Sequence, residues 1–171
     1  MMDIKSLRVQ SRPINHIAIS VSDIDAVVDW YSRVLGFQLI GNIIHIKRAE
    51  DPSAGIFQIY PPDLNEVKIA YLATGNGIGF EVFQFVDPAP VTPEKPFEYT
   101  RGGFFHICVT DSDPARLAQT MTEAGGRQIG QMVIRVDDEC LYVADPWGHV
   151  VEILNTSFDR LATAIASDVG I

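Results

Sequence analysis

Two histidines and two glutamates occupy equivalent places in two similar halves of the chain. The stretch HIAISVSD at residues 16–23 returns ninety positions later as HICVTDSD at residues 106–113. Further along each half, GFEVF at residues 79–83 matches VVEIL at residues 150–154, and each places one acid within an apolar run. A repeat present in two copies indicates a duplicated supersecondary unit rather than a solenoid, which needs at least three repeats.

The four side chains in question are His16, Glu81, His106 and Glu152. A lone carboxylate in an apolar strand is costly to bury without a partner. A divalent cation shared by both His/Glu pairs would remove that cost, because imidazole nitrogen and carboxylate oxygen suit Ni, Zn, Co, Fe or Mn. Taken singly, a strand histidine is more often an ordinary core or edge residue, and a strand glutamate can face solvent. The repetition favours one shared metal ion.

The elements that must position these residues follow the same order in both halves. Alternation puts His16 and Ala18 on one face of the first strand, and His106 and Cys108 on one face of its counterpart. The first half predicts a helix capped by Ser22 or Asp23, then strands, with these ranges: strand 15–20, helix to Gly36, strand 37–46, irregular insertion 47–65, strand 66–73, turn 75–77 and strand 78–85.

The second half predicts the same pattern, followed by a C-terminal helix. Its ranges are strand 103–110, helix 113–124, strands 128–136, 140–144 and 149–154, and helix 157–167. The sequence therefore predicts an α+β fold of two tandem β-α-β-β-β modules, with strands in a curled mixed sheet and helices outside. The segments are a 1–13 arm, a 14–86 module, an 87–101 Pro-rich linker, a 102–155 module and a 156–171 tail.

Composition excludes several classes of function. The chain has 171 residues, 47% of them hydrophobic, and a formal charge of −9 without a dense Lys/Arg run, so we expect no nucleic-acid surface. No segment reaches the roughly 18 apolar residues of a membrane span, and the N-terminus carries no apolar signal region. Cys108 and Cys140 lack metal or redox spacing, which indicates reduced thiols in a cytoplasmic protein.

Several motifs resemble the vicinal oxygen chelate superfamily, which holds glyoxalase I, bleomycin and fosfomycin resistance proteins, extradiol dioxygenases and methylmalonyl-CoA epimerase. The resemblance covers residues 14–154. It rests on the opening NHIAISVSD, the helix end with Trp30-Tyr31 before LGF, and the closing DPWGHVVE at residues 145–152. It implies that the two modules surround one divalent metal ion, with His16, Glu81, His106 and Glu152 as ligands.

The ligand set separates the members of this superfamily. The bacterial nickel type of glyoxalase I uses His, Glu, His and Glu, as this chain offers. Extradiol dioxygenases and fosfomycin enzymes use two His and one Glu, which would make Glu81 surplus, and epimerases usually carry Gln at that place. The resemblance thus implies a glyoxalase-like lyase. The alternatives are a dioxygenase, an epimerase, or a metal-free ligand-binding or resistance protein of the same fold.

The mechanism implied by the resemblance is isomerisation of a glutathione hemithioacetal through a metal-bound enediolate. Glu152 is the expected base, with Glu81 as the opposing carboxylate. Proton abstraction beside a metal-bound carbonyl is the broader expectation, since epimerisation uses the same apparatus. We expect a homodimer, as in relatives that build each site from two chains. Tyr142, Trp147 and His149 are interpreted as turn and packing residues. The candidate substrate-lining side chains are Phe83, Phe85, Phe104, Cys108 and Met132.

Overall fold

Each half of the chain begins with a strand that leads through an aspartate into a helix. Strand β1 (His16–Ser20) precedes Asp23, whose carboxylate accepts a hydrogen bond from Ala26 N at the start of α1 (Ile24–Leu35). Strand β6 (Ile107–Thr110) precedes Asp113, which accepts from Arg116 N at the start of α3 (Pro114–Glu123). These are N-caps at equivalent places in the repeat, so the duplicated sequence encodes a duplicated strand–helix unit.

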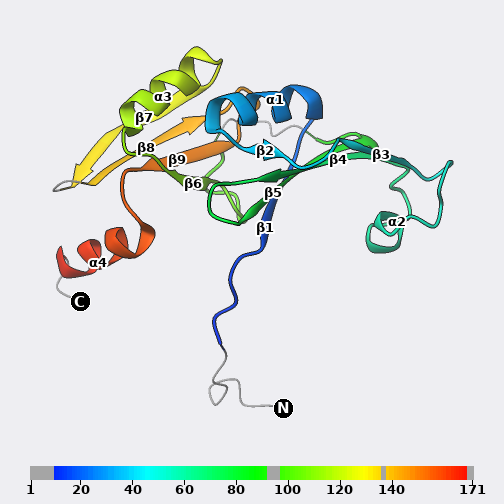
Figure 1. Cartoon of the computed structure of the whole chain (residues 1–171), viewed down its shortest axis with the longest axis horizontal. Helices are drawn as coiled ribbons and strands as arrows, with labels where there is room; N and C mark the ends of the chain where they lie inside the picture. Colours follow the sequence, from blue (N-terminus) through cyan, green and yellow to red (C-terminus); the bar gives the residue numbers. More distant parts are fainter. Residues whose placement is uncertain (1–9, 92–96, 136–137, 169–171) are drawn as a thin grey trace. The chain divides into compact units, whose positions relative to one another are not determined.

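The computed structural model describes residues 10–91, 97–135 and 138–168, and the chain divides into two compact units, 1–90 and 91–171 (Figure 1). In the first unit the remaining elements are β2 (Gln38–Leu39), β3 (Ile44–Lys47), α2 (Ile56–Ile59), β4 (Glu66–Ala73) and β5 (Gly79–Asp87). In the second they are β7 (Arg127–Arg135), β8 (Asp138–Ala144), β9 (Val150–Leu154) and α4 (Phe158–Asp168).

The two sheets share one connectivity. In the first unit β1 pairs in parallel with β5, and β5 pairs antiparallel with β4, giving the order β1-β5-β4-β2 with β3 also on β4. In the second, β6 pairs in parallel with β9 and the order is β6-β9-β8-β7. The fold is therefore the mixed α+β architecture that the sequence predicts, with one mixed sheet in each module.

One face of each sheet is covered by its helix. Helix α1 buries an apolar side against β4 and β5, where Tyr31 stacks on Phe80 with ring centroids 4.9 Å apart and also contacts Phe37. Helix α1 ends at Gly36, which adopts φ 72°, as the sequence predicts for its C-terminal glycine. Helix α3 contacts β7, β8 and β9 and buries Met121 completely.

Two predicted strands are shorter than expected. The stretch 37–46 is divided into β2 and β3, because Gly41 adopts φ 73° and interrupts the pairing with β4. The predicted strand 103–110 begins only at Ile107, because Gly103, at φ 127°, turns the chain and residues 103–105 do not pair with β9. The predicted strand 128–136 ends at a residue that lies outside the described ranges.

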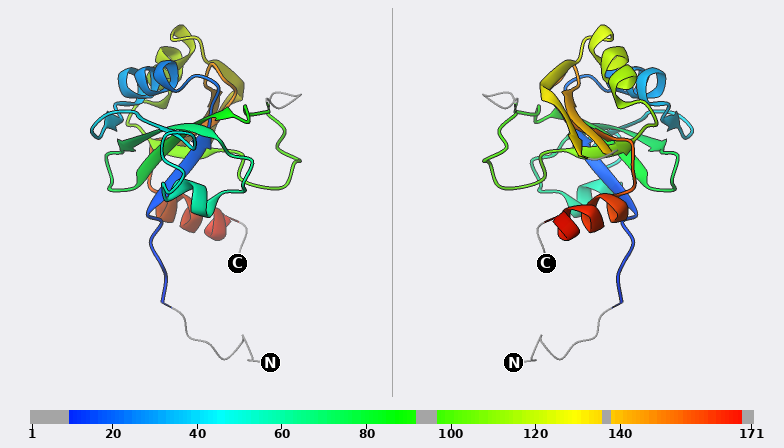
Figure 2. Two further views of the ribbon diagram at one scale, coloured as in Figure 1. Left: turned by 90° about the vertical axis from the view of Figure 1, so that its right-hand side faces the viewer. Right: turned by 90° about the vertical axis from the view of Figure 1, so that its left-hand side faces the viewer.

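The two ends of the chain differ in structure. Residues 10–15 are exposed and run away from the first sheet as an extended arm (Figures 1 and 2). Helix α4 closes the described part of the chain, and Arg160 Nε lies 3.5 Å from Asp138 Oδ1 on β8. Among the described helices, none has the length and apolar character needed to cross a bilayer.

Candidate metal centre

The first His/Glu pair lies on the face of the first sheet opposite α1. Strand register places Ala18 beside Glu81 and His16 beside Gly79, so the histidine and the acid share one face of neighbouring strands. His16 Nε2 lies 3.6 Å from Glu81 Oε2. A Cβ atom at Gly79 would lie 3.1 Å from His16 Cβ, so the absence of a side chain at this position leaves room for the imidazole.

The second pair repeats this arrangement. Cys108 stands beside Glu152 in the β6/β9 register, as Ala18 stands beside Glu81. His106 Nε2 lies 3.2 Å from Glu152 Oε2, and the exposed fractions of these side chains are 26% and 14%, against 49% and 20% for His16 and Glu81. The second pair is therefore the more enclosed of the two.

Both pairs have the separation expected of two ligands on one cation. Metal–nitrogen and metal–oxygen bonds of about 2.1 Å at right angles place neighbouring ligand atoms about 3 Å apart. The observed distances are 3.2 and 3.6 Å between Nε2 and Oε2, and neither contact is a hydrogen bond in the described structure. The donor set of imidazole nitrogen and carboxylate oxygen suits first-row divalent ions, so each pair fits as half of such a site.

The second ring nitrogens of the two histidines differ. Asn15 Oδ1 lies 2.8 Å from His16 Nδ1, so it can accept the Nδ1–H hydrogen and leave the Nε2 lone pair free, an arrangement common in metal-binding histidines. His106 Nδ1 is buried without a hydrogen-bond partner among the described residues. The His106 ring is instead flanked by Phe105 and Tyr142, with ring centroids 4.6 and 5.4 Å away.

Each unit by itself supplies two candidate ligands. Within the described ranges no three His, Cys, Asp or Glu side chains gather in a geometry that could hold a metal ion. His45 and Glu66 form a further pair, with Nε2 and Oε1 2.6 Å apart. They belong to β3 and β4, and both side chains are partly exposed. The joining of His16, Glu81, His106 and Glu152 in one site remains a prediction.

The carboxylate of Glu152 has additional partners in its own sheet. Tyr142 Oη donates to Glu152 Oε1 at 3.0 Å, and Cys140 Sγ donates to the same oxygen at 3.1 Å. Burial, followed by the Glu152 carboxylate, raises the pKa of the Cys140 thiol to about 12 and moves the pKa of the Tyr142 phenol upward as well. The surrounding protein atoms, followed by the same carboxylate, raise the pKa of Cys108 to about 12, although this side chain also reaches the surface. All three groups therefore remain protonated at neutral pH.

The predicted substrate-lining residues lie in different surroundings. Phe83 is buried and stacks on Phe85, with ring centroids 5.7 Å apart, and both pack in the α2 region. Phe104 is fully exposed before β6, Cys108 is exposed on β6, and Met132 is half-buried at the irregular stretch of β7. Their roles in substrate binding remain predictions.

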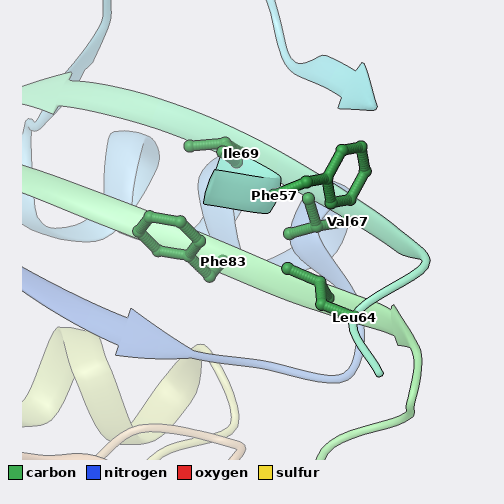
Figure 3. Close-up of a cluster of buried hydrophobic side chains, with 5 residues drawn as sticks. All are labelled: Phe57, Leu64, Val67, Ile69 and Phe83. Carbon is green, nitrogen blue, oxygen red and sulfur yellow. The ribbon is translucent and has the colours of Figure 1, made fainter. Parts of the chain in front are cut away.

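The insertion at residues 47–65 is anchored to the sheet face that carries Glu81. Helix α2 brings Phe57 into a buried cluster with Leu64, Val67, Ile69 and Phe83 (Figure 3). The Arg48 guanidinium carbon lies 4.3 Å from the Phe57 ring centroid, and Arg48 Nε donates to Leu64 O. A cavity of about 410 Å³ at the base of this insertion is lined by Lys47, Arg48, Ala49, Asn65 and Glu66. None of its lining residues belongs to the His16/Glu81 pair or to the His106/Glu152 pair.

The sequence reasoning missed the hydrogen bonds to Glu152. It assigned Tyr142 to turn packing, whereas the phenol binds a candidate ligand. The position of the turn at residues 145–148 would have allowed the contact between Tyr142 and Glu152 to be predicted. If Ala144 and Val150 close that hairpin, Tyr142 must stand directly across from Glu152, as the observed register has it. The hydrogen bond between Asn15 and His16 could not be predicted in this way, because the sequence does not show whether the side chain of a neighbouring residue points toward the imidazole.

The family model described as "Glyoxalase/Bleomycin resistance protein/Dioxygenase superfamily" matches residues 13–153. The chain therefore belongs to that superfamily. The match spans both modules, including all four candidate ligands.

Individual relatives are distant. A curated 2-epi-5-epi-valiolone epimerase of an Actinomyces species is 24% identical over 151 residues, which cover 83% of this chain and 78% of that protein. The crystal structure of a glyoxalase family protein from Bacillus cereus matches with a TM-score of 0.71 at 15% identity, covering 86% of this chain and 95% of the other. The fosfomycin resistance protein FosX of Mesorhizobium loti matches at 0.56 and 14% identity, with coverages of 90% and 99%.

Proposed function

We propose that the protein is a divalent-metal-dependent enzyme that moves a proton next to a carbonyl group of a substrate with vicinal oxygens. The observation that carries the proposal is the repeated His/Glu pair, with Nε2 and Oε2 3.6 Å apart in one module and 3.2 Å apart in the other. His16, Glu81, His106 and Glu152 would hold the ion. When bound, a divalent ion supplies Lewis-acid stabilisation of the negative charge that develops on the substrate oxygens.

The carboxylates provide the acid–base chemistry in this proposal. Glu152 takes the proton from the carbon beside the carbonyl and returns it to the neighbouring carbon, and Glu81 is the opposing carboxylate. Only Oε1 of Glu152 accepts hydrogen bonds from Tyr142 and Cys140. Oε2, which faces His106, is therefore the oxygen free to bind the ion, and it would have to leave the ion in part before it could take the substrate proton.

The first candidate activity is that of a glyoxalase, acting on the hemithioacetal of a 2-oxoaldehyde and glutathione. Support comes from the superfamily match and from the carboxylate at Glu81, which completes a His, Glu, His, Glu set. We expect a cytoplasmic homodimer, and sedimentation of the purified protein measures its mass.

The second candidate is epimerisation of a cyclic polyhydroxy ketone. The specific observation in its favour is the 24% identity with a 2-epi-5-epi-valiolone epimerase over most of both chains. An epimerase would use the same carboxylates, taking a proton from one face of the carbon and returning one to the other face.

One experiment tests the proposal and divides the candidates. The metal-loaded protein is incubated in deuterated water with the glutathione hemithioacetal of methylglyoxal or with 2-epi-5-epi-valiolone, and deuterium at the carbon next to the carbonyl is followed by NMR. We expect exchange or turnover with one compound and its loss in Glu81→Gln and Glu152→Gln. A Glu81→Gln variant with full metal content and full turnover would overturn the four-ligand proposal.

A further inference from the structure

The two candidate carboxylates are held in different ways. Glu152 Oε1 accepts the Tyr142 hydroxyl at 3.0 Å and the Cys140 thiol at 3.1 Å. Tyr142 stands directly across from Glu152 in the β8/β9 register, and Cys140 stands across from Leu154, two residues along the same face. Both donors therefore come from one neighbouring strand, and their positions are fixed by the ladder between β8 and β9.

Glu81 lacks this support although its surroundings are otherwise similar. Tyr71 stands directly across from Glu81 in the β4/β5 register, as Tyr142 does for Glu152. In the described structure Tyr71 forms no hydrogen bond with Glu81, and 38% of its surface is exposed. The place that corresponds to Cys140 is taken by Ile69, which stands across from Phe83 and cannot donate. His16 Nε2, at 3.6 Å, is the polar neighbour found for Glu81 among the described residues.

We propose that Tyr142 and Cys140 are positioning residues that hold Glu152 by Oε1, so that Oε2 stays beside His106 Nε2 and the second module forms a preorganised half of the metal site. This inference rests on the proposed function. Hydrogen bonds that fix a ligating carboxylate lower the ordering required when the ion binds, and removal of such partners typically lowers metal affinity 10- to 100-fold. The first module, in which Glu81 has no such donors, forms the looser half.

The chemistry of the two donors supports this role. A phenol and a thiol each carry one hydrogen to donate, and both reach the same oxygen of Glu152 while its other oxygen stays beside His106. The His106 ring also meets the Tyr142 ring edge to face, with centroids 5.4 Å apart. Tyr142 therefore contacts both members of the second pair, through its hydroxyl and through its ring.

The test is a titration of the metal-free protein with Co²⁺, followed by the visible absorption of the bound ion. We expect Tyr142→Phe and Cys140→Ala each to weaken Co²⁺ binding about tenfold and to change the absorption spectrum, because Glu152 is no longer fixed. Tyr71→Phe is the matched control and should bind Co²⁺ within about twofold of the unaltered protein. Cys140→Ser, which keeps a donor, should recover most of the affinity lost in Cys140→Ala. Circular dichroism and urea unfolding check that each variant is folded.

The outcomes separate this inference from the proposed function. If the unaltered protein binds Co²⁺ while Tyr142→Phe has the same affinity and spectrum, the positioning role is wrong and the metal site stands. An equal loss in Tyr71→Phe would also overturn it, because the effect would then not depend on the hydrogen bond to Glu152. If the unaltered protein binds no Co²⁺, the proposed function and this inference both fail.

Discussion

At the scale of single residues, the two halves of the candidate site share ligand types and differ in the groups around them. Asn15 orients His16 in the first module, whereas Tyr142 and Cys140 hold Glu152 in the second. Each module thus fixes one of its two candidate ligands by hydrogen bonds. The supported ligand is the histidine in one half and the acid in the other.

Asn15 is expected to influence metal binding through His16. Replacement by alanine removes the acceptor 2.8 Å from Nδ1, so the ring loses its preferred orientation and tautomer. We expect Asn15→Ala to reduce Co²⁺ affinity about tenfold. His45→Gln is the control, since His45 pairs with Glu66 and lies outside the proposed site. Unchanged affinity in Asn15→Ala, or an equal loss in His45→Gln, would contradict the assignment.

The Cys140 thiol should react slowly in the folded, metal-free protein. Its pKa of about 12, compared with 9.0 for an ordinary thiol, leaves on the order of a thousandfold less thiolate at pH 8. Alkylation by iodoacetamide, measured by mass spectrometry, should therefore be about a thousandfold slower than in urea and should accelerate with each step in pH. Equal rates in the native and urea-unfolded protein would show that the thiol is not protected.

The raised pKa of the Cys140 thiol also makes the free energy of unfolding depend on pH. Between pH 9 and 12 the folded protein keeps a thiol proton that the unfolded chain releases. The free energy of unfolding should therefore fall as the pH rises through this range.

At the scale of elements, much of the fold is predictable from the sequence, because the repeat contains residues that mark where its helices begin and end. Asp23 and Asp113 cap the two helices, and Gly36 ends the first. Strand β4 has the bounds that the sequence predicts. The break between β2 and β3 was missed because it depends on Gly41 adopting a positive φ, and glycine also occurs within strands.

Helix α2 was also missed, since it is a single turn held in place by tertiary contacts. Its residues 56–59 form too short a segment to show helical periodicity. What fixes α2 is the packing of Phe57 on Val67, Ile69 and Phe83, which lie ten or more residues away in the chain. Contacts of this kind follow from the folded sheet and leave no local sequence pattern.

Phe57 should therefore anchor the insertion. The side chain is 7% exposed and packs in the cluster of Figure 3. We expect Phe57→Ala to lower the free energy of unfolding by about 3 kcal/mol, because it leaves a cavity beneath α2. Ile59→Ala on the same helix is the control, since Ile59 is 80% exposed and should change stability by less than about 0.5 kcal/mol. Urea unfolding measures both, and equal effects would contradict the anchoring role.

At the scale of the whole molecule, duplication accounts for the architecture and for the candidate site. The same connectivity of strands occurs in both sheets, and in each the acid on the closing strand faces the residue two places beyond the histidine. The His/Glu pairing within each module could be predicted, because the sequence shows the repeat and because side chains along a strand alternate between its two faces. The hydrogen bonds that distinguish Glu152 from Glu81 could not be read from the repeat. A tyrosine stands across from the acid in both copies, and among the described residues only Tyr142 donates to it.

The most direct test of the central claim is the stoichiometry of metal binding, measured by equilibrium dialysis with Co²⁺ or Ni²⁺. We predict one ion per chain in the unaltered protein. We also predict that this ion is lost both in the double variant His16→Ala/Glu81→Gln and in His106→Ala/Glu152→Gln, because each module supplies half of the ligands. Retention of the ion in either double variant, or two independent ions per chain, would contradict a site that both modules share.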